Sequence, residues 1–322
     1  MMIYYAVLTI VGLGLLVFSA DKLVDKSVEI AEKFGLSPIV VGLTVVAFGT
    51  SFPELVFTTG ASLNGSGGLA IGNIIGSNIT NSLLILGIAA MIGPLNITQA
   101  LIWRDGSVWA ISTIVFVVLI YTQSYLGALS GALLLFTLVG YLYLLVKNDI
   151  LAETSDGSDD LETDAEEAGQ LRQNEHLKTA GIILLALIGI ALGSEVSIYG
   201  AVGLAEFLGV SEAVIGLSII ALGTSLPELA TVLVCMRRNQ GGMLVGNIIG
   251  SNIFNILACI GVPALFVGIA VPSELLTFSV PLLLAVSAAT LLMLRTDWTL
   301  SRREGAACLC GYGLYVTALA LL

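Results

Sequence analysis

The chain has 322 residues, of which 57% are hydrophobic and only 11% are charged. This composition excludes a soluble globular domain and places the protein in a lipid bilayer. The net charge of -11 comes mainly from one short acidic segment near the middle of the chain.

A membrane-spanning helix needs roughly 20 apolar residues, and the sequence contains ten stretches that approach this length. In chain order, the predicted spans are residues 3–20, 39–61, 69–92, 107–121, 126–146, 179–198, 213–235, 243–270, 275–294 and 306–322. No basic region leads into the first stretch, so we expect a retained helix rather than a cleaved secretion signal. The predicted fold class is an all-α integral membrane protein with ten transmembrane helices.

A search for internal similarity finds two related halves. Residues 41–55 match residues 215–229 at 9 of 15 positions, and residues 71–81 match residues 245–255 at 9 of 11 positions. Both matches share one repeat offset, which pairs Val41 with Ile215 and Ile71 with Val245 and leaves no gap between the blocks. The chain is therefore predicted to be a duplicated five-helix unit.

The direction of each half follows from the number of helices and from the basic residues. Because five is odd, the second unit would cross the membrane in the opposite direction, an arrangement typical of secondary transporters. Short cytoplasmic loops collect lysine and arginine, and all 12 basic residues follow odd-numbered predicted helices. We therefore expect both termini outside the cell. The predicted domains are a first repeat at 1–147, an acidic cytoplasmic linker at 148–176 and a second repeat at 177–322.

The linker carries ten acidic residues and resembles a calcium sensor only in composition. The spacing of Asp156, Asp159, Asp160 and Glu162 does not match the alternating ligands of an EF-hand loop. We predict a solvated, poorly ordered segment, with weak attraction of cations as the alternative. His176, the only histidine, is expected to be solvated at its end.

The predicted spans also contain small residues that we interpret as packing residues. Thiols inside membrane helices usually pack as small apolar groups, and those of this chain are Cys235, Cys259, Cys308 and Cys310. Glycines with G-x-x-x-G spacing let helices approach closely, and here they are Gly72, Gly76, Gly246 and Gly250. We expect these glycines to let the helices of the two motifs touch.

Two carboxylates, Glu54 and Glu228, are expected at mid-membrane, one in each repeat. An ionisable group at this depth costs about 2.5 to 3.5 kcal/mol on the insertion scale and is usually functional. Each glutamate follows a proline, which has no N–H for the carbonyl four residues back, at Gly49 and Gly223. Such carbonyls are tolerated where they line a cavity or bind ions, so the prolines are predicted to be part of a site.

Helical spacing places further oxygen-bearing groups on two stripes in each repeat, one on the face of the carboxylate and one on the following helix. They are Ala47, Thr50, Ser51, Ser77 and Asn81 in the first repeat and Ala221, Thr224, Ser225, Ser251 and Asn255 in the second. Carboxylates, amides, hydroxyls and backbone carbonyls suit hard cations such as calcium and sodium rather than zinc or copper. Taken singly, a serine or threonine in a membrane helix more often serves packing or an interhelical hydrogen bond than an ion.

The segments Gly49-Thr-Ser-Phe-Pro-Glu54 and Gly223-Thr-Ser-Leu-Pro-Glu228 are each followed by Gly-Asn-Ile-Ile-Gly-Ser-Asn-Ile. They resemble the two alpha repeats of the calcium/cation antiporter superfamily, in its prokaryotic sodium/calcium exchanger branch. The resemblance covers all ten predicted helices. It implies a ten-helix fold that binds calcium between the two glutamates, assisted by the carbonyls of Thr50 and Thr224.

The resemblance further implies sodium sites on either side of the calcium, and competition for the shared carboxylates couples the exchange. The implied sodium ligands are Ala47, Thr50, Ser51, Glu54 and Ser77 on one side and Ala221, Thr224, Ser225, Glu228 and Ser251 on the other. Some members carry an acid where this chain has Asn81 or Asn255. Potassium-dependent relatives also carry an acid there, so asparagine at both positions argues against potassium dependence. The two glutamates leave a formal charge of about -2, which matches one calcium ion.

The resemblance also implies that the first and sixth helices slide as a gate past a fixed core. In this chain these are the glycine-bearing segments around Gly12 and Gly14 and around Gly189 and Gly193.

The sequence therefore predicts a plasma-membrane antiporter that exchanges sodium for calcium, rather than an enzyme. We expect no organic cofactor, no nucleic acid and no obligatory protein partner besides the lipid bilayer. Exchange of protons for calcium or another divalent cation on the same fold is the main alternative, since glutamates also carry protons. A passive cation channel and an intramembrane protease with paired acids are weaker alternatives, and the protease explains neither the duplicated ligands nor the inverted halves.

Overall fold

The structure, a computed structural model, describes residues 1–155, 167–208 and 223–321. It is mostly helical, as expected from composition. The helices before the linker are α1 (Met2–Phe34), α2 (Pro38–Val41), α3 (Ala47–Thr50), α4 (Phe52–Leu63), α5 (Gly67–Thr80), α6 (Leu86–Ile92), α7 (Gln99–Leu101), α8 (Ser107–Thr122) and α9 (Ala128–Ser155). Those after it are α10 (Glu167–Phe207), α13 (Leu226–Arg237), α14 (Gly241–Phe254), α15 (Gly261–Phe266), α16 (Glu274–Thr277), α17 (Ser279–Arg295) and α18 (Arg302–Leu321). The π-helical segments are η1 (Gly42–Val46), η2 (Asn81–Ile85), η3 (Ile102–Gly106) and η5 (Asn255–Ile260).

Six helices within the described residues are long and apolar enough to cross a membrane. They are Met2–Phe34, Gly67–Ile92, Gln99–Thr122, Ala128–Asp149, Leu177–Phe207 and Gly241–Phe266. A seventh span results if Pro38–Thr50 and Phe52–Leu63, which are bent by 43° relative to each other, count as one. The apolar helix Ser279–Arg295 is shorter, and the predicted stretch at 213–235 begins outside the described residues.

The predicted stretch at 39–61 is not continuous, because it breaks at Ser51. Ser51 has φ −82° and ψ 2°, outside the helical region, and Pro53 stands in the first turn of α4. The proline ring has no N–H and clashes with the preceding turn, so a helix ends before it. Ser225 has nearly the same angles before α13. Each break places a glutamate in the first turn of the following helix, where the free N–H groups favour negative charge.

Several elements of the second half follow those of the first at the repeat offset. Helix α13 has the bounds that this offset derives from α4, and α14 has those that it derives from α5. Two short ladders, unforeseen in the all-α expectation, pair β1 (Leu95–Asn96) with β4 (Thr299–Leu300) and β2 (Tyr125–Leu126) with β3 (Ile269–Ala270). The partners Leu95 and Leu300 correspond at this offset to the partners Ile269 and Leu126.

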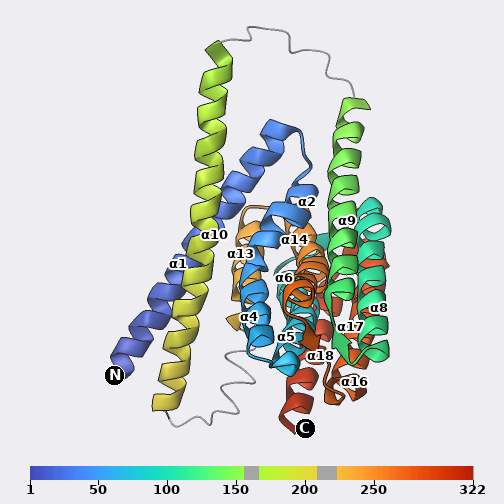
Figure 1. The fold of residues 1–322 in the computed structure, drawn as a ribbon. Coiled ribbons are helices and arrows are strands. Elements are labelled where there is room, and N and C mark those ends of the chain that lie inside the picture. The colour runs from blue at the N-terminus through green and yellow to red at the C-terminus, as the bar shows by residue number, and fades with distance from the viewer. Residues whose placement is uncertain (156–166, 209–222, 322) are drawn as a thin grey trace.

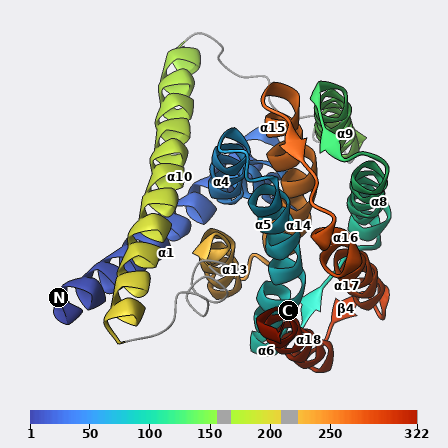
Figure 2. The same ribbon diagram turned by 60° about the horizontal axis from the view of Figure 1, so that its bottom comes forward.

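Helices α1 and α10 cross at one side of the bundle (Figure 1). Helix α13 lies between this crossing pair and the central helices α5 and α14, and α8, α9 and α17 lie on the far side (Figure 2). Met1 and the end of α18 lie at the same end of the bundle (Figure 1). The opposite end carries the start of α10, so the long axis of the bundle separates the termini from the linker.

Glycines allow the backbones of α1 and α10 to touch. A Cβ at Gly12 would lie 2.5 Å from the backbone nitrogen of Ser197, and one at Gly193 would lie 2.6 Å from that of Leu16. A Cβ at Gly189 would meet the hydroxyl of Ser19. Gly14, in contrast, has open space around it, so three of the four glycines expected in the gate lie at the helix crossing.

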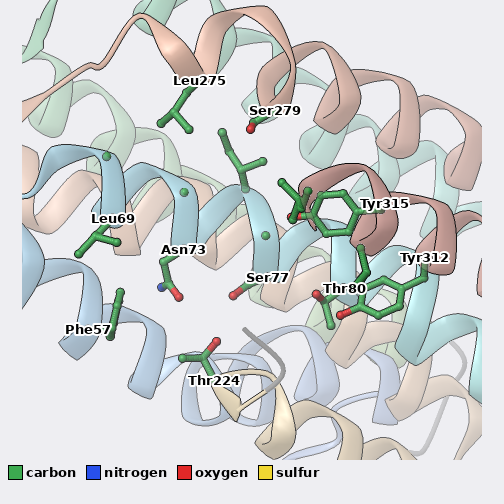
Figure 3. Close-up of a pocket in the computed structure, with 16 residues that line it drawn as sticks. Phe57, Leu69, Asn73, Ser77, Thr80, Thr224, Leu275, Ser279, Tyr312 and Tyr315 are labelled. Carbon is green, nitrogen blue, oxygen red and sulfur yellow. The ribbon is translucent and has the colours of Figure 1, made fainter. Parts of the chain in front are cut away.

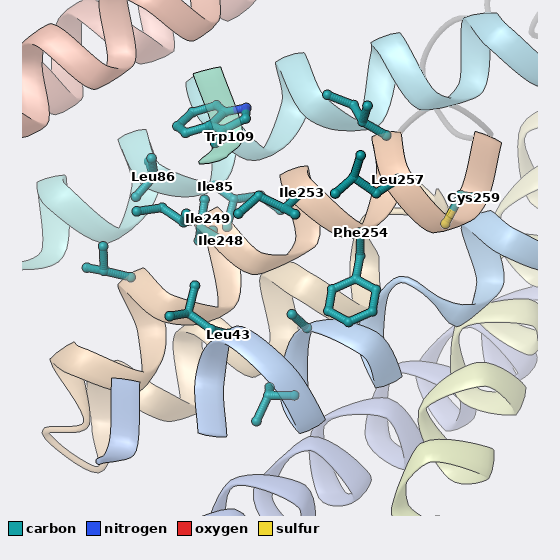
Figure 4. Packing of buried hydrophobic residues seen from close by; sticks show 14 of the residues in the cluster. Leu43, Ile85, Leu86, Trp109, Ile248, Ile249, Ile253, Phe254, Leu257 and Cys259 are labelled. Atoms are coloured by element: carbon teal, nitrogen blue, oxygen red, sulfur yellow. The ribbon is translucent and has the colours of Figure 1, made fainter. Parts of the chain in front are cut away.

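The apolar core surrounds α14 and η5 (Figure 4). Nearly every residue of these two segments is buried, as expected for a helix enclosed on all sides. Gly246 and Gly250 allow this close packing, because a Cβ at either position would lie within 3 Å of the first motif helix. The same prediction is wrong for Gly72, which has nothing within 4 Å, and for Gly76, whose nearest neighbour is 3.6 Å away.

The helices that flank the linker are longer than predicted. Helix α9 continues to Ser155 and α10 begins at Glu167, so both extend into the segment 148–176. Asp149 of α9 accepts hydrogen bonds from the backbone N–H and the hydroxyl of Ser37, at 2.8 and 3.0 Å. This contact fixes the start of α2. The predicted acidic positions at 156–166 lie outside the described residues, and so does the side chain of His176.

The four cysteines form no disulfide. Cys235, Cys259 and Cys308 are buried and Cys310 is exposed. The interpretation as packing residues therefore holds for three of them. No group of three or more histidine, cysteine or acidic side chains among the described residues could hold a metal ion.

Candidate functional site

Glu54 of α4 and Glu228 of α13 are fully buried. Ser51, at the break in the first motif helix, donates from its hydroxyl to Oε1 of Glu228 at 3.4 Å. Ser77 of α5 donates to Oε1 of Glu54 at 3.5 Å. The structure thus joins the two halves of the chain at one buried pair of carboxylates.

Among the described residues, the second oxygen of each carboxylate has no hydrogen-bond partner. Besides Oε2 of Glu54 and of Glu228, the carbonyl oxygen of Asn81 and the hydroxyl of Ser225 are buried without a partner in this part of the chain. Leaving a charged or polar group unsatisfied in an apolar interior is costly. Oxygen atoms of this kind are the ligands that sodium and calcium prefer, so the donor set fits a hard cation.

Four asparagines connect α5 and η2 to α14 and η5. The amide of Asn81 donates to the side-chain oxygen of Asn252 at 3.4 Å, and Asn255 donates to that of Asn78 at 3.0 Å. These bonds use the nitrogen atoms and leave the oxygen of Asn81 available. The oxygen of Asn255 accepts a weak bond from the thiol of Cys259. The sequence analysis missed Asn78 and Asn252, although both stand in the duplicated Gly-Ser-Asn-Ile segment.

Thr50 contacts two other predicted site residues, Ser251 and Ala47. Its hydroxyl lies 3.3 Å from that of Ser251 and 3.4 Å from the carbonyl oxygen of Ala47. It also donates to the side-chain oxygen of Asn247 at 3.2 Å, a residue that the sequence analysis did not single out. Ala221, the counterpart of Ala47, lies outside the described residues.

One of the two carbonyls released by proline is not free. Ser194 of α10 donates to the carbonyl oxygen of Gly223 at 2.9 Å. The expectation that this oxygen is unpaired is therefore wrong, and the break before α13 is instead tied to α10. The position equivalent to Ser194 in the first half is Ala20, which has no hydroxyl. Comparison of the two repeats therefore gave no sign of this bond.

Two cavities lie beside the site. The first, of about 390 Å³, is lined by Ser77 of α5 and by Thr224, which lie on either side of it (Figure 3). The second, of about 490 Å³, lies between α4 and α10 and also reaches Thr224. Thr224 is half-buried, in agreement with a position where water meets the buried carboxylates.

The family model for the sodium/calcium exchanger protein matches residues 4–147 and 178–321. These two segments contain both carboxylates and all but the central part of the chain. The chain belongs to the sodium/calcium exchanger protein family.

Relatives of this exchanger cover nearly the whole chain. The sodium/calcium exchanger MaX1 of Methanosarcina acetivorans is 30% identical, over 96% of this chain and 97% of its own length. The inner membrane protein YrbG of Escherichia coli is 39% identical, over 82% of this chain and 80% of its own length. A structure of the sodium-calcium exchanger NCX_Mj, soaked with 10 mM Na+ and zero Ca2+, is 32% identical with a TM-score of 0.82. It covers 99% of this exchanger and 100% of its own chain.

Outside its buried site, the exchanger has an ion-pair cluster between α1 and the end of α13. Arg238 binds Asp21 through two nitrogens, at 3.0 and 2.8 Å, and Asp25 through a third, at 2.9 Å. Arg237 also binds Asp21. Pairing through the planar guanidinium is the geometry in which such contacts are strongest. The cluster connects the crossing pair of helices to the core that carries Glu228.

This cluster should contribute measurably to stability. In a double-mutant cycle of Asp21→Asn and Arg238→Gln, we expect a coupling energy of about 0.5 to 1 kcal/mol at low salt, reduced at high salt. Thermal unfolding of the purified exchanger in lipid nanodiscs would measure it. Glu32→Gln, at an exposed site on the same helix, is the matched control. Strictly additive effects of the two substitutions would exclude the coupling.

Proposed function

We propose that this exchanger moves calcium and sodium in opposite directions across the plasma membrane, at a site built on Glu54 and Glu228. The observation that carries the proposal is the pair of buried carboxylates, each with one oxygen that has no partner among the described residues. Together they supply a charge that one calcium ion neutralises and that sodium can share. Membership of the exchanger family supports calcium and sodium as the two transported ions.

The proposed ligands extend to both sides of the carboxylates. They are Ala47, Thr50, Ser51, Ser77 and Asn81 from the first half and Ala221, Thr224, Ser225, Ser251 and Asn255 from the second. Contacts of Thr50 and Ser51 with residues of the second half support this arrangement. Because sodium and calcium would share the same carboxylates, one ion must leave before the other binds, which couples their movements.

We further propose that the chain has ten transmembrane helices in two repeats of opposite orientation. The repeats at 1–147 and 177–322 would be joined by the acidic linker at 148–176. The equal offsets of helices α4 and α13 and of α5 and α14 support the duplication. The reciprocal pairing of the two short ladders supports a twofold relation between the halves. The distribution of basic residues supports termini outside and a cytoplasmic linker.

Alternating access would come from α1 and α10 moving as a pair. Their contacts with each other are extensive, and glycine contacts keep the two backbones together. The core helices α5 and α14 are linked instead by the asparagine pairs. A movement of the crossing pair relative to this core would open the carboxylates to one side of the membrane at a time.

The proposal is tested by calcium uptake into proteoliposomes loaded with sodium and diluted into sodium-free buffer. We expect calcium to accumulate only when the vesicles contain sodium, and to do so against its gradient. Accumulation that ignores sodium but follows a pH gradient would replace sodium by protons as the coupling ion. Equilibration without accumulation would indicate a channel and overturn the proposal.

A further inference from the structure

An acidic side chain outside the duplicated motifs, Glu195, lies within the membrane span of α10. The span runs from Leu177 to Phe207, so Glu195 is far from both of its ends. Acids at such positions normally face a basic partner or a water-filled cavity. The sequence analysis expected only Glu54 and Glu228 at this depth, although Glu195 stands inside the predicted stretch 179–198.

Glu195 lines the larger of the two cavities, of about 490 Å³. The same cavity is lined by Pro53 and Thr224, which directly precede Glu54 and Ser225 in the chain. Ser194, the neighbour of Glu195, binds the carbonyl oxygen of Gly223. This bond fixes α10 against the break before α13, and Glu195 is exposed beside this break.

The charge of Glu195 is not compensated. No ion pair within the described residues involves it. Its counterpart at the repeat offset is Asp21, which binds Arg237 and Arg238. The positions equivalent to these arginines on the side of Glu195 are Leu63 and Asn64. The same helix position is therefore neutralised at one end of the bundle and left negative at the other.

We propose that Glu195 is a cation-recruiting residue of this cavity, which raises the local concentration of calcium and sodium before they reach the buried carboxylates. A cleft with one sign of charge and low-dielectric walls focuses the electric field and increases association rates. Glu195 would not be a ligand of the transport site, because none of the site's hydrogen bonds includes it. This role rests on the proposed function, since it concerns the ions that the exchanger carries.

The first test is the calcium dependence of sodium-driven uptake with Glu195→Gln. We expect the KM for calcium to rise about threefold to tenfold, with maximal turnover unchanged and a weaker effect of ionic strength on KM. Glu206→Gln, on the same helix, exposed and outside the lining of the cavity, should leave KM unchanged. If the KM is unchanged in Glu195→Gln while the wild type exchanges normally, the role of Glu195 is overturned but the proposed function is not.

The second test does not depend on transport. Ile198 lines the same cavity one helical turn away, and Cys310 is the exposed cysteine. In an Ile198→Cys, Cys310→Ser variant, a cationic membrane-impermeant thiol reagent should react several-fold faster than an anionic one. Adding Glu195→Gln should remove most of this preference.

The two tests separate the possible failures. A wild type without sodium-dependent uptake would refute the proposed function, while the labelling experiment still measures the field of Glu195. A thiol at position 198 that reacts with neither reagent would mean that the cavity holds no water and would overturn the inference. Equal reaction with both reagents before and after Glu195→Gln would overturn it as well.

Discussion

Replacing Glu54 or Glu228 by glutamine should abolish sodium-dependent calcium transport. Each carboxylate supplies half of the negative charge at a site where both side chains are fully buried. Loss of one charge from a buried, paired arrangement costs about 3 to 5 kcal/mol, which corresponds to a loss of at least about a hundredfold in affinity. The amide also places a donor where the ion needs an oxygen. Uptake of radioactive calcium into sodium-loaded proteoliposomes measures the effect.

Glu274→Gln is the matched control, because Glu274 is exposed in the short helix α16 and should transport like the wild type. The glutamine variants should remain monodisperse after purification, since the change is isosteric and removes the repulsion between the two carboxylates. A folded Glu54→Gln protein with normal exchange would contradict the assignment of the site. Loss of activity in only one of the two variants would contradict the shared role of the carboxylates.

The sequence was sufficient to locate the two carboxylates because both copies of the motif align at one offset, which pairs Glu54 with Glu228. The repeat offset derived from the motifs also relates the helix bounds of α5 and α14. Proline chemistry pointed to a disturbed helix before each glutamate. It did not predict the bend at Ser51, since the angle depends on packing against α10 and α14, which the local sequence does not contain.

The individual hydrogen bonds between the halves could not be predicted from the sequence. The pairs Asn81 with Asn252 and Asn255 with Asn78 connect residues from opposite halves of the chain, and helical periodicity concerns only neighbours along one helix. Ser194 was missed because its bond to Gly223 joins two different helical segments of the second half. Glu195 was different, because an acid inside an apolar stretch is visible in the sequence even though it stands outside the duplicated motifs.

The hydrogen bonds at the carboxylates are not symmetric, although the sequence motifs are. Ser51 donates to Glu228, whereas its counterpart Ser225 has no side-chain partner within the described residues. Ser77 donates to Glu54, whereas its counterpart Ser251 lies beside Thr50. Two equivalent halves that adopt different local arrangements are what alternating access requires, because each half must take both arrangements in turn.

Replacing Gly193 by leucine should separate α1 from α10 and stop transport. A Cβ at this position would lie 2.6 Å from the backbone nitrogen of Leu16 and 2.9 Å from the carbonyl oxygen of Gly12. Backbone atoms cannot rotate away as a flexible side chain can, so the helices themselves must move. Overpacking of this kind costs about 1 to 3 kcal/mol or more. We expect a thermal midpoint several degrees lower and at least tenfold slower calcium uptake.

Gly14→Leu gives the matched control, since Gly14 lies on α1 with nothing within 4 Å of its added Cβ. Leucine is a better helix former than glycine by roughly 0.8 kcal/mol, so this change should leave stability equal or slightly higher. The same glycine-to-leucine change is therefore expected to lower stability at position 193 and to keep or slightly raise it at position 14. If Gly193→Leu retained full stability and transport, the backbones of α1 and α10 would not be in contact, and a paired movement of these helices would lose its structural basis.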